Sequence, residues 1–338
     1  MTEYHQFEFN LRTVAPVHIG EGKTITTKEF LYEEGEKRGN YYFPDMPTLY
    51  KRMCELGLQE DFEEYLMGKG KRDLRAFFDQ HQIKETDFGG YRIKETKYET
   101  EVKGKLNNIV TFIKDAYGNP YIPGSSLKGA IRTILVNRHF HTDNVKWGNS
   151  KDGVDDIFNE IRVSDSEPIP FDRLLICQKW DVSVKKGIPN PLPLFRESLT
   201  PFTKVKFTIT TTTARAHYLI ENLEEMAKQF YERNYAPTFL SAFPSKYIQG
   251  NYKAPIYLGA GSGLWSKVDH QHVDIEGIRR QTPRKMKMKF NGALKLTKSR
   301  IVRYKTPKKD GSFERHVLII NNENLYEMGK CGFKIKEL

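Results

Sequence analysis

The sequence has few cysteines, and they lie far apart. Cys54, Cys177 and Cys331 are the only three, and no two of them form a CxxC pair. An odd number of distant cysteines argues against a disulfide framework and against a zinc site built from thiolates. We therefore expect three buried thiols.

Long apolar runs are also absent. No stretch approaches the roughly 18 consecutive apolar residues of a membrane-spanning helix. The first residues, MTEYHQFEFN, lack the basic and then apolar order of a secretory signal peptide. These absences predict a protein of the cytoplasm that does not enter a membrane.

Positive charge is what the chain has in excess. Its 338 residues include 54 lysines and arginines against 43 aspartates and glutamates, which gives a formal net charge of +11. Such an excess makes a polyanion the natural large partner, although charge alone does not separate nucleic acid from a membrane surface. With 38% hydrophobic residues, the chain can fill the cores of two ordinary domains.

The first segment alternates apolar and polar residues over positions 7–11, the period of a half-buried strand. This strand leads into HIGEGKT. There Gly20 and Gly22 permit a turn that brings backbone close to a ligand, with His18 and Lys23 beside it. A plain glycine hairpin turn explains the same letters equally well.

Residues 47–82 change to a helical period. Three short amphipathic segments are separated by glycines, and Pro47 suits the first turn of the first helix. They predict a helical insertion between strands, over about residues 47–105. Asp45, in FPDMP, is interpreted simply as the residue that enters this helix.

The stretch YIPGSSLKGAIRTIL follows a predicted strand at residues 109–114 and a turn at residues 118–120. Strand, turn and then helix is the context that a phosphate-binding loop requires. The first turn of a helix has unpaired N–H groups and a partial positive charge, so an anion there gains hydrogen bonds and electrostatic attraction together. The spacing GxxxxGK[ST] is missing, so this is not the nucleoside-triphosphate loop.

Within that helix, Ser125 is a candidate cap that follows Gly124 and precedes Ser126. Lys128 and Arg132 are four residues apart and are expected along one exposed edge. The predicted buried stripe consists of Leu127, Ile131, Ile134 and Leu135. A capped structural helix with solvated cations is the alternative interpretation.

A second glycine-rich loop occurs late, in IYLGAGSGLWSKV. Gly259, Gly261 and Gly263 are two apart, whereas a dinucleotide fingerprint needs its third glycine three residues after the second. A Rossmann site is therefore excluded. The pattern still predicts a strand and a loop that lets backbone approach a partner closely, with Trp265 and Lys267 available for stacking and phosphate contact.

Four possible metal ligands lie two apart in VDHQHVDIE: His270, His272, Asp274 and Glu276. On a strand they would line one face, as in a metal-dependent nuclease. Their spacing matches neither a structural zinc pattern nor HExxH, and a polar surface stretch has the same composition. We therefore expect no metal, no cofactor and no catalytic residue.

Several motifs together resemble a known family. RTVAPVHIGEG, YIPGSSLKGAIRT, IRVSDSEPI and LGAGSGLWSKV, in this order, resemble the RAMP superfamily of CRISPR proteins. With MKFNGALKLTKSR and MGKCGFKIKEL toward the C-terminus, the order and spacing are similar to subunits of type III-A effector complexes. The resemblance spans nearly the whole chain and is weakest over the helical region.

The resemblance implies an α+β fold of two tandem ferredoxin-like (RRM-like) domains. They would comprise residues 1–200, with the helical insertion, and residues 201–338, with the late glycine-rich loop. The second would open with a strand over residues 205–209 and a helix over residues 219–230, where apolar residues recur at the matching periods. Neither half has the motif of ordinary RNA-recognition domains, so contacts through glycine loops and helix ends are expected instead of base stacking on a sheet.

The resemblance also implies an RNA-binding subunit that is not an enzyme. Such a subunit lies at one end of a ribonucleoprotein, follows the 3′ part of the CRISPR RNA (crRNA) and caps the repeated backbone RAMP subunit. It supports complex assembly and crRNA maturation, in which host nucleases are further partners. The predicted RNA contacts are His18, Gly20, Gly22, Lys23, Gly124, Ser125, Ser126, Lys128, Arg132, Gly259, Gly261, Gly263 and Lys267. A metal-dependent endoribonuclease and a protein-binding scaffold are the alternatives.

Overall fold

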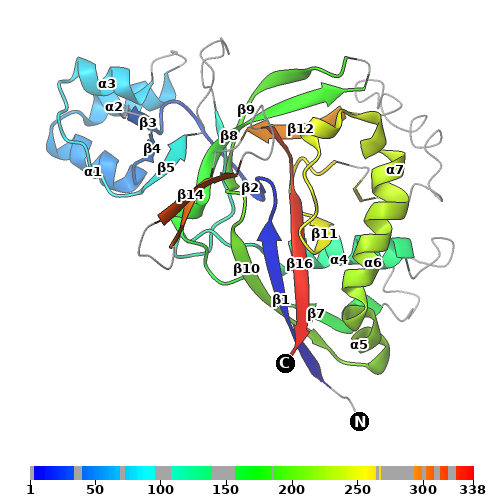
Figure 1. The fold of residues 1–338 in the computed structure, drawn as a ribbon. Helices are drawn as coiled ribbons and strands as arrows, with labels where there is room; N and C mark the ends of the chain where they lie inside the picture. Colours follow the sequence, from blue (N-terminus) through cyan, green and yellow to red (C-terminus); the bar gives the residue numbers. More distant parts are fainter. Residues whose placement is uncertain are drawn as a thin grey trace, which may run out of the picture.

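The computed structural model describes most of the chain as a mixed α and β fold (Figure 1). Among the described residues, no helix is both long and apolar enough to cross a membrane. The described residues are 4–33, 40–68, 73–95, 108–138, 157–184, 186–263, 266–267, 293–298, 302–307, 313–318 and 325–338.

The first sheet is antiparallel, with five strands in the order β11-β16-β1-β10-β7. Its strands are β1 (His5–Thr13), β7 (Ile161–Val163), β10 (Lys204–Thr211), β11 (Ala254–Tyr257) and β16 (Lys330–Glu337). The alternation predicted at residues 7–11 is confirmed, because Phe7, Phe9 and Leu11 are buried. Strand β1 is central, and Phe9 pairs with Phe207 on one side and Ile335 on the other.

Helices pack against this first sheet (Figure 1). They are α4 (Gly124–Arg138), α5 (Ala214–Glu221) and α6 (Leu223–Phe230), and α6 continues through the π-helical turn η5 (Tyr231–Tyr235) into α7 (Ala236–Thr238). The predicted apolar stripe of α4 is confirmed, because all four of its residues are buried. The short 3-10 turns are η3 (Ile157–Asn159), η4 (Phe171–Arg173), η6 (Leu240–Ala242) and η7 (Ser245–Tyr247).

The second sheet follows the order β2-β6-β9-β8-β5-β4-β3, and β12 pairs with both β8 and β15. Its strands are β2 (Gly20–Ile25), β3 (Leu31–Glu33), β4 (Asn40–Phe43), β5 (Tyr91–Glu95), β6 (Ile109–Phe112), β8 (Leu174–Ser183), β9 (Pro189–Leu199), β12 (Ala293–Lys298) and β15 (Leu325–Glu327). Two of its pairings, β5 with β8 and β6 with β9, are parallel. Strands β13 (Val302–Pro307) and β14 (Phe313–Leu318) form a separate hairpin.

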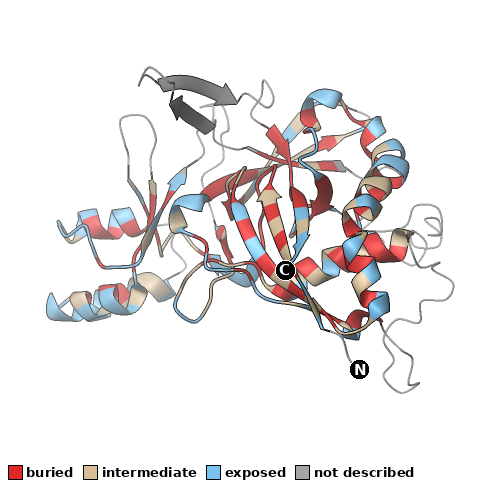
Figure 2. Cartoon of the chain, turned by 60° about the horizontal axis from the view of Figure 1, so that its bottom comes forward, coloured by how far each residue is buried: buried red, intermediate tan, exposed pale blue. Residues whose placement is uncertain are grey.

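The predicted helical insertion is present between β4 and β5. It consists of α1 (Met46–Glu55), α2 (Gln59–Met67) and α3 (Leu74–Gln80), and it projects from the main body (Figure 1). Its inward faces form a second buried cluster that includes Leu49, Phe62 and Phe77 (Figure 2). Asp45 caps α1, because its Oδ2 accepts a hydrogen bond of 3.0 Å from the N–H of Thr48.

Two expectations, on the cysteines and on the N-terminal glycine turn, differ from the structure. Cys54 is exposed on α1, whereas Cys177 and Cys331 are buried as predicted. The segment HIGEGKT continues as strand β2, with a bulge between Gly20 and Thr24, instead of forming a turn.

The tandem ferredoxin-like arrangement is not confirmed. Both sheets combine strands from either side of residue 200: β1 and β7 pair within one sheet with β10 and β16, and β12 joins β8 in the other. Both sheets therefore depend on pairing between strands that are distant in the sequence, a property that local motifs do not report.

Candidate nucleic-acid interface

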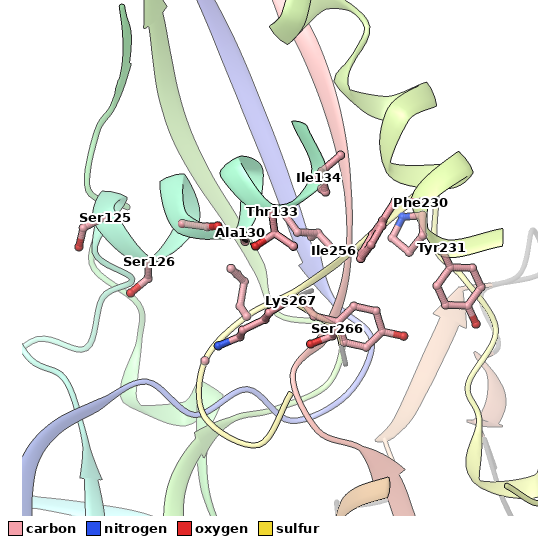
Figure 3. Close-up of a pocket in the computed structure, with 15 residues that line it drawn as sticks. Ser125, Ser126, Ala130, Thr133, Ile134, Phe230, Tyr231, Ile256, Ser266 and Lys267 are labelled. Carbon is pink, nitrogen blue, oxygen red and sulfur yellow. Dashed lines mark hydrogen bonds between the residues drawn. The ribbon is translucent and has the colours of Figure 1, made fainter. Parts of the chain in front are cut away.

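Two of the predicted glycine-rich motifs meet at one cavity of about 280 Å³. Ser125, Ser126 and Gly129 line it from the first turns of α4, while Ser266 and Lys267 line it from the segment after β11. Figure 3 shows Lys267 reaching toward the Ser126 side, with Phe230 and Tyr231 on the opposite side. The cavity is thus lined by a lysine, several hydroxyl groups and two aromatic rings on one side.

The N-terminus of α4 is anchored by the motif IRVSDSEPI. The N–H of Gly124 donates to Asp165 Oδ1 over 2.7 Å. A Cβ atom at Gly124 would lie 2.4 Å from the carbonyl oxygens of Val163 and Ser164, so only glycine fits there. The helix begins at Gly124, which places Ser125 inside the first turn instead of at the cap, and a carboxylate of the chain already accepts from the first amide.

Lys128 and Arg132 lie on the stripe of α4 next to the one that lines the cavity, since three and four residues separate neighbours on a helix. Both side chains are partly buried. The guanidinium of Arg132 lies over the ring of Phe158, 4.5 Å from its centroid. The expected exposed edge is therefore wrong for Arg132, because the residue packs on η3.

His18 is buried, with 2% of its surface exposed. Its Nδ1–H donates to the carbonyl oxygen of Glu197 over 2.6 Å, since a carbonyl oxygen only accepts. Burial lowers the pKa of His18 to about 4. The imidazole is consequently neutral near pH 7 and belongs to the interior.

The backbone of His18 also positions the late glycine loop. Its carbonyl oxygen accepts from the N–H of Ala260 over 2.8 Å. A Cβ atom at Gly259 would lie 2.1 Å from that same oxygen, and Gly259 has a φ of +73°. Glycine is required at position 259 because two chain segments approach closely.

The other glycines of the late loop differ in their surroundings. A Cβ at Gly261 would lie 2.7 Å from Met328 Sδ, whereas Gly263 is exposed and has open space around it. The hydroxyl of Ser262 donates to the carbonyl oxygen of Gly259 over 2.9 Å, which closes the loop. Gly263 is therefore free of packing constraints that fix the first two glycines.

Gly20, Gly22 and Lys23 lie on the exposed strand β2. Gly22 has a φ of +87° within the bulge, with no heavy atom within 4 Å of a built Cβ. None of the three lines the cavity. The middle and late motifs therefore meet at the cavity, whereas the N-terminal glycines lie on strand β2, outside it.

A group of charged residues that the sequence analysis missed lies on one face of the second sheet. Lys179 and Asp181 come from β8, Arg196 from β9 and Lys295 from β12. Lys295 Nζ is 2.8 Å from Asp181 Oδ2, and Lys179 Nζ is 3.6 Å from Asp181 Oδ1. We call Lys179, Arg196 and Lys295 the basic cluster, in which both lysines pair with the carboxylate of Asp181.

The basic cluster has unused capacity for an anion. Among the described residues, the Nε and Nη1 atoms of Arg196 are buried and have no hydrogen-bond acceptor. Burial, together with the charges of Lys295 and Arg196, lowers the pKa of Lys179. An incoming anion would relieve this repulsion. No sequence signal identified the cluster, because its members belong to three strands that pair only in the fold.

Two of the sequence predictions fall outside the described residues. They are the possible metal ligands His270, His272, Asp274 and Glu276, and the predicted stacking residue Trp265. Both stay predictions.

Both the sequence and the fold of this chain are similar to those of a known protein superfamily. The sequence profile of the RAMP superfamily matches residues 10–261. Two solved structures share the fold: a Csm–crRNA–target RNA ternary complex of a type III-A CRISPR–Cas system (TM-score 0.63, 18% identity, 97% of this chain and 100% of that chain) and T. onnurineus Csm5 (TM-score 0.55, 17% identity, 96% and 99%).

Proteins of similar sequence identify a narrower group within this superfamily. The chain is 44% identical to the CRISPR system Cms protein Csm5 of Streptococcus thermophilus, over 99% of both chains. It is 31% identical to Csm5 of Mycobacterium tuberculosis, over 77% of this chain and 82% of the relative. The chain belongs to the RAMP superfamily and, within it, to the Csm5 proteins of CRISPR systems.

Proposed function

We propose that this chain is the RNA-binding subunit that caps one end of a type III-A Csm effector complex in the cytoplasm. It contacts the 3′ part of the crRNA, meets the backbone RAMP subunit and supports assembly and crRNA maturation by host nucleases, without being an enzyme itself. The 44% identity to a Csm5 protein over the full chain supports this proposal. So does the fold shared with a chain from a Csm–crRNA–target RNA complex.

One observation carries the RNA-binding part of the proposal: the first turns of α4 and the late glycine loop converge on a single cavity beside Lys267. Small hydroxyl residues and glycines let a backbone approach closely, and an exposed lysine supplies a counter-charge to phosphate. Such contacts recognise the sugar–phosphate chain and not base edges. Binding should therefore depend steeply on salt and little on RNA sequence.

The basic cluster extends the proposed interface to the second sheet. Its two lysines pair with the single carboxylate of Asp181, and two nitrogens of Arg196 lack an acceptor among the described residues. A phosphate group would supply the missing acceptors and reduce the repulsion among the cations. We propose that the crRNA backbone contacts this cluster as well as the cavity.

A charge reversal at Lys267 tests the cavity. Lys267→Glu should weaken binding of unrelated single-stranded RNAs to the full-length protein and lower the slope of log K against log salt by about one unit or more. The matched control is Lys51→Glu, which reverses an exposed lysine on α1 outside both proposed contact regions. Fluorescence-anisotropy titrations at several salt concentrations measure both variants. Equal affinities and slopes for the two variants would refute the cavity as an RNA contact.

Replacement of Lys179 tests the basic cluster. Lys179→Met should weaken RNA binding, because one cation is lost. It should also leave the protein unchanged or more stable, by up to about 1 kcal/mol, because repulsion and burial of a charge are relieved. Urea denaturation and RNA titration of the same samples measure both effects. Weaker RNA binding accompanied by a clear loss of stability would instead assign Lys179 to the fold.

A further inference from the structure

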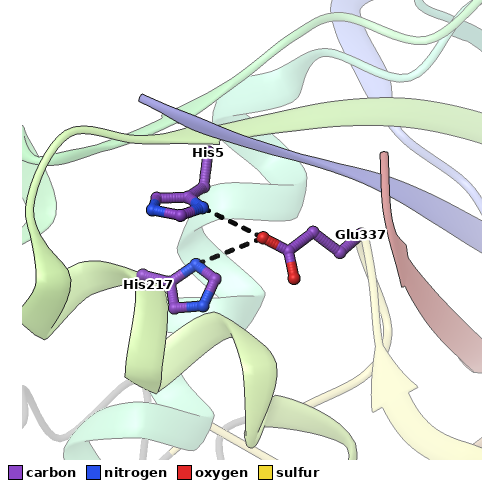
Figure 4. A group of neighbouring side chains, drawn as sticks. All are labelled: His5, His217 and Glu337. Atoms are coloured by element: carbon purple, nitrogen blue, oxygen red, sulfur yellow. Dashed lines mark hydrogen bonds and ion pairs between the residues drawn. The ribbon is translucent and has the colours of Figure 1, made fainter. Parts of the chain in front are cut away.

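Three side chains from distant parts of the sequence meet at the outer end of the first sheet. His5 starts β1, Glu337 ends β16 and His217 lies on α5. They come together because Phe7 pairs with Glu337 across the strands, and α5 packs on β10, the other neighbour of β1. Figure 4 shows both imidazole rings directing a nitrogen at the same carboxylate oxygen.

The spacing of the ligand atoms fits a metal ion. The Nδ1 atom of His5 lies 3.0 Å from Glu337 Oε1, and the Nδ1 atom of His217 lies 3.8 Å from it. One ligand atom from each residue lies within 4.8 Å of the others. Zinc binds histidine nitrogen and carboxylate oxygen at about 2.0–2.2 Å in a tetrahedron, whose ligands are then about 3.4 Å apart. The two distances bracket this value.

Hydrogen bonding alone does not account for the cluster. The Nδ1–H of His5 can donate to Glu337, but the Nδ1 atom of His217 is buried and has no hydrogen-bond partner among the described residues. A cation between the three residues would use that nitrogen. The other ring nitrogen of His217 lies 4.0 Å from Glu221 Oε2, which places a carboxylate behind the imidazole, as is common for histidines that bind metals.

The cluster is open enough for an ion to enter. The side chains of His5, His217 and Glu337 are 32%, 21% and 46% exposed. Three protein ligands leave one position of a tetrahedron to water. Imidazole and carboxylate groups favour zinc and similar first-row divalent ions over calcium or magnesium, which prefer oxygen ligands.

We propose that His5, His217 and Glu337 bind a divalent transition-metal ion, with zinc as the best match. The ion would fasten the first strand, the last strand and α5 to one another. This site is separate from the cavity beside α4 and from the basic cluster, so its role is structural and does not depend on RNA. It also differs from the ligands predicted at residues 270–276.

The test uses the full-length protein, stripped of metal with a chelator and titrated with zinc chloride. We expect the melting temperature to rise by several degrees at saturating zinc, and calorimetry to detect a site that needs these residues. His217→Ala and Glu337→Gln should each weaken that site by about 10-fold or more. Glu337→Gln changes only an exposed group near the chain end and should keep the fold. It therefore still tests the site if His217→Ala fails to fold.

Two controls make the outcome specific. His81→Ala removes a partly exposed histidine of the insertion that lies 3.8 Å from Asp61, and it should leave zinc binding unchanged. A double replacement, His270→Ala with His272→Ala, tests the segment predicted from sequence. If zinc binding survives in His217→Ala and Glu337→Gln, or if it is lost only in the double variant, the proposed site is wrong.

Discussion

His18 illustrates how burial changes the role of a residue expected at the RNA surface. Its ring donates to Glu197 and its carbonyl oxygen holds Ala260, so it connects β9 to the late glycine loop. Its influence on RNA would be indirect, through the shape of that loop. Of the predicted contacts, Ser125, Ser126, Gly259 and Lys267 line the cavity where we propose that RNA binds.

The pKa of His18 predicts an acid sensitivity. The folded state holds a neutral imidazole with a pKa of about 4, against an ordinary value of 6.5. The unfolded chain therefore binds more protons between these values, and stability is lost as the pH falls from about 6.5 to about 4. The loss due to this residue is about 3 kcal/mol.

His18→Asn provides the comparison, because an asparagine amide can still donate to the Glu197 carbonyl and does not titrate. Urea denaturation at pH 7 and at pH 4.5 should show a smaller loss of stability in the variant than in the parent. An identical loss in both proteins would mean that other groups account for the acid sensitivity.

At the level of elements, α4 contains two glycines with opposite requirements. A Cβ at Gly124 would collide with two backbone carbonyls, whereas a Cβ at Gly129 meets nothing within 4 Å. Gly129 also lines the cavity. One glycine thus serves packing, and the other keeps space beside the proposed RNA contact.

These glycines make a matched pair of substitutions. Gly124→Ala should destabilise the protein by about 3 kcal/mol, because neither carbonyl can move aside without shifting the strand β7 segment. Gly129→Ala should stabilise it by up to about 1 kcal/mol through helix propensity, while its methyl group narrows the cavity and weakens RNA binding. Thermal unfolding and RNA titration measure both. A stable Gly124→Ala variant would contradict the close packing of α4 on the IRVSDSEPI motif.

At the scale of the whole molecule, the first sheet depends on both chain halves. Strand β1 lies between β10 and β16, and it has no other neighbour in that sheet. A fragment that ends at residue 200 would leave both edges of β1 unpaired and expose its buried aromatic residues.

We therefore expect residues 1–200, expressed alone, to lack the cooperative unfolding transition of the full-length chain, and residues 201–338 likewise. Circular dichroism during thermal unfolding measures this, with the full-length chain as the control. When the two fragments are expressed together, they should associate and recover the transition. A transition in the first fragment alone at the temperature of the full-length chain would support the tandem domains predicted from the sequence.

The sequence alone determined the features that depend on neighbouring residues. The cap at Asp45, the helical insertion, the alternation of β1 and the buried stripe of α4 all follow from local period and capping chemistry, which act over one or two turns. The family motifs could likewise be recognised from the sequence. Each motif is a short segment whose backbone geometry requires particular residues.

Only the tertiary structure decided which of those segments touch. The glycines at 124 and 259 are required by close contact with residues 163–164 and 18, partners that no local pattern names. Lys179, Arg196 and Lys295 became one cluster through strand pairing, and His5, His217 and Glu337 met through the junction of the two chain ends. Contacts between distant segments depend on which strands pair and in what order, and the side-chain period within one segment does not give that order.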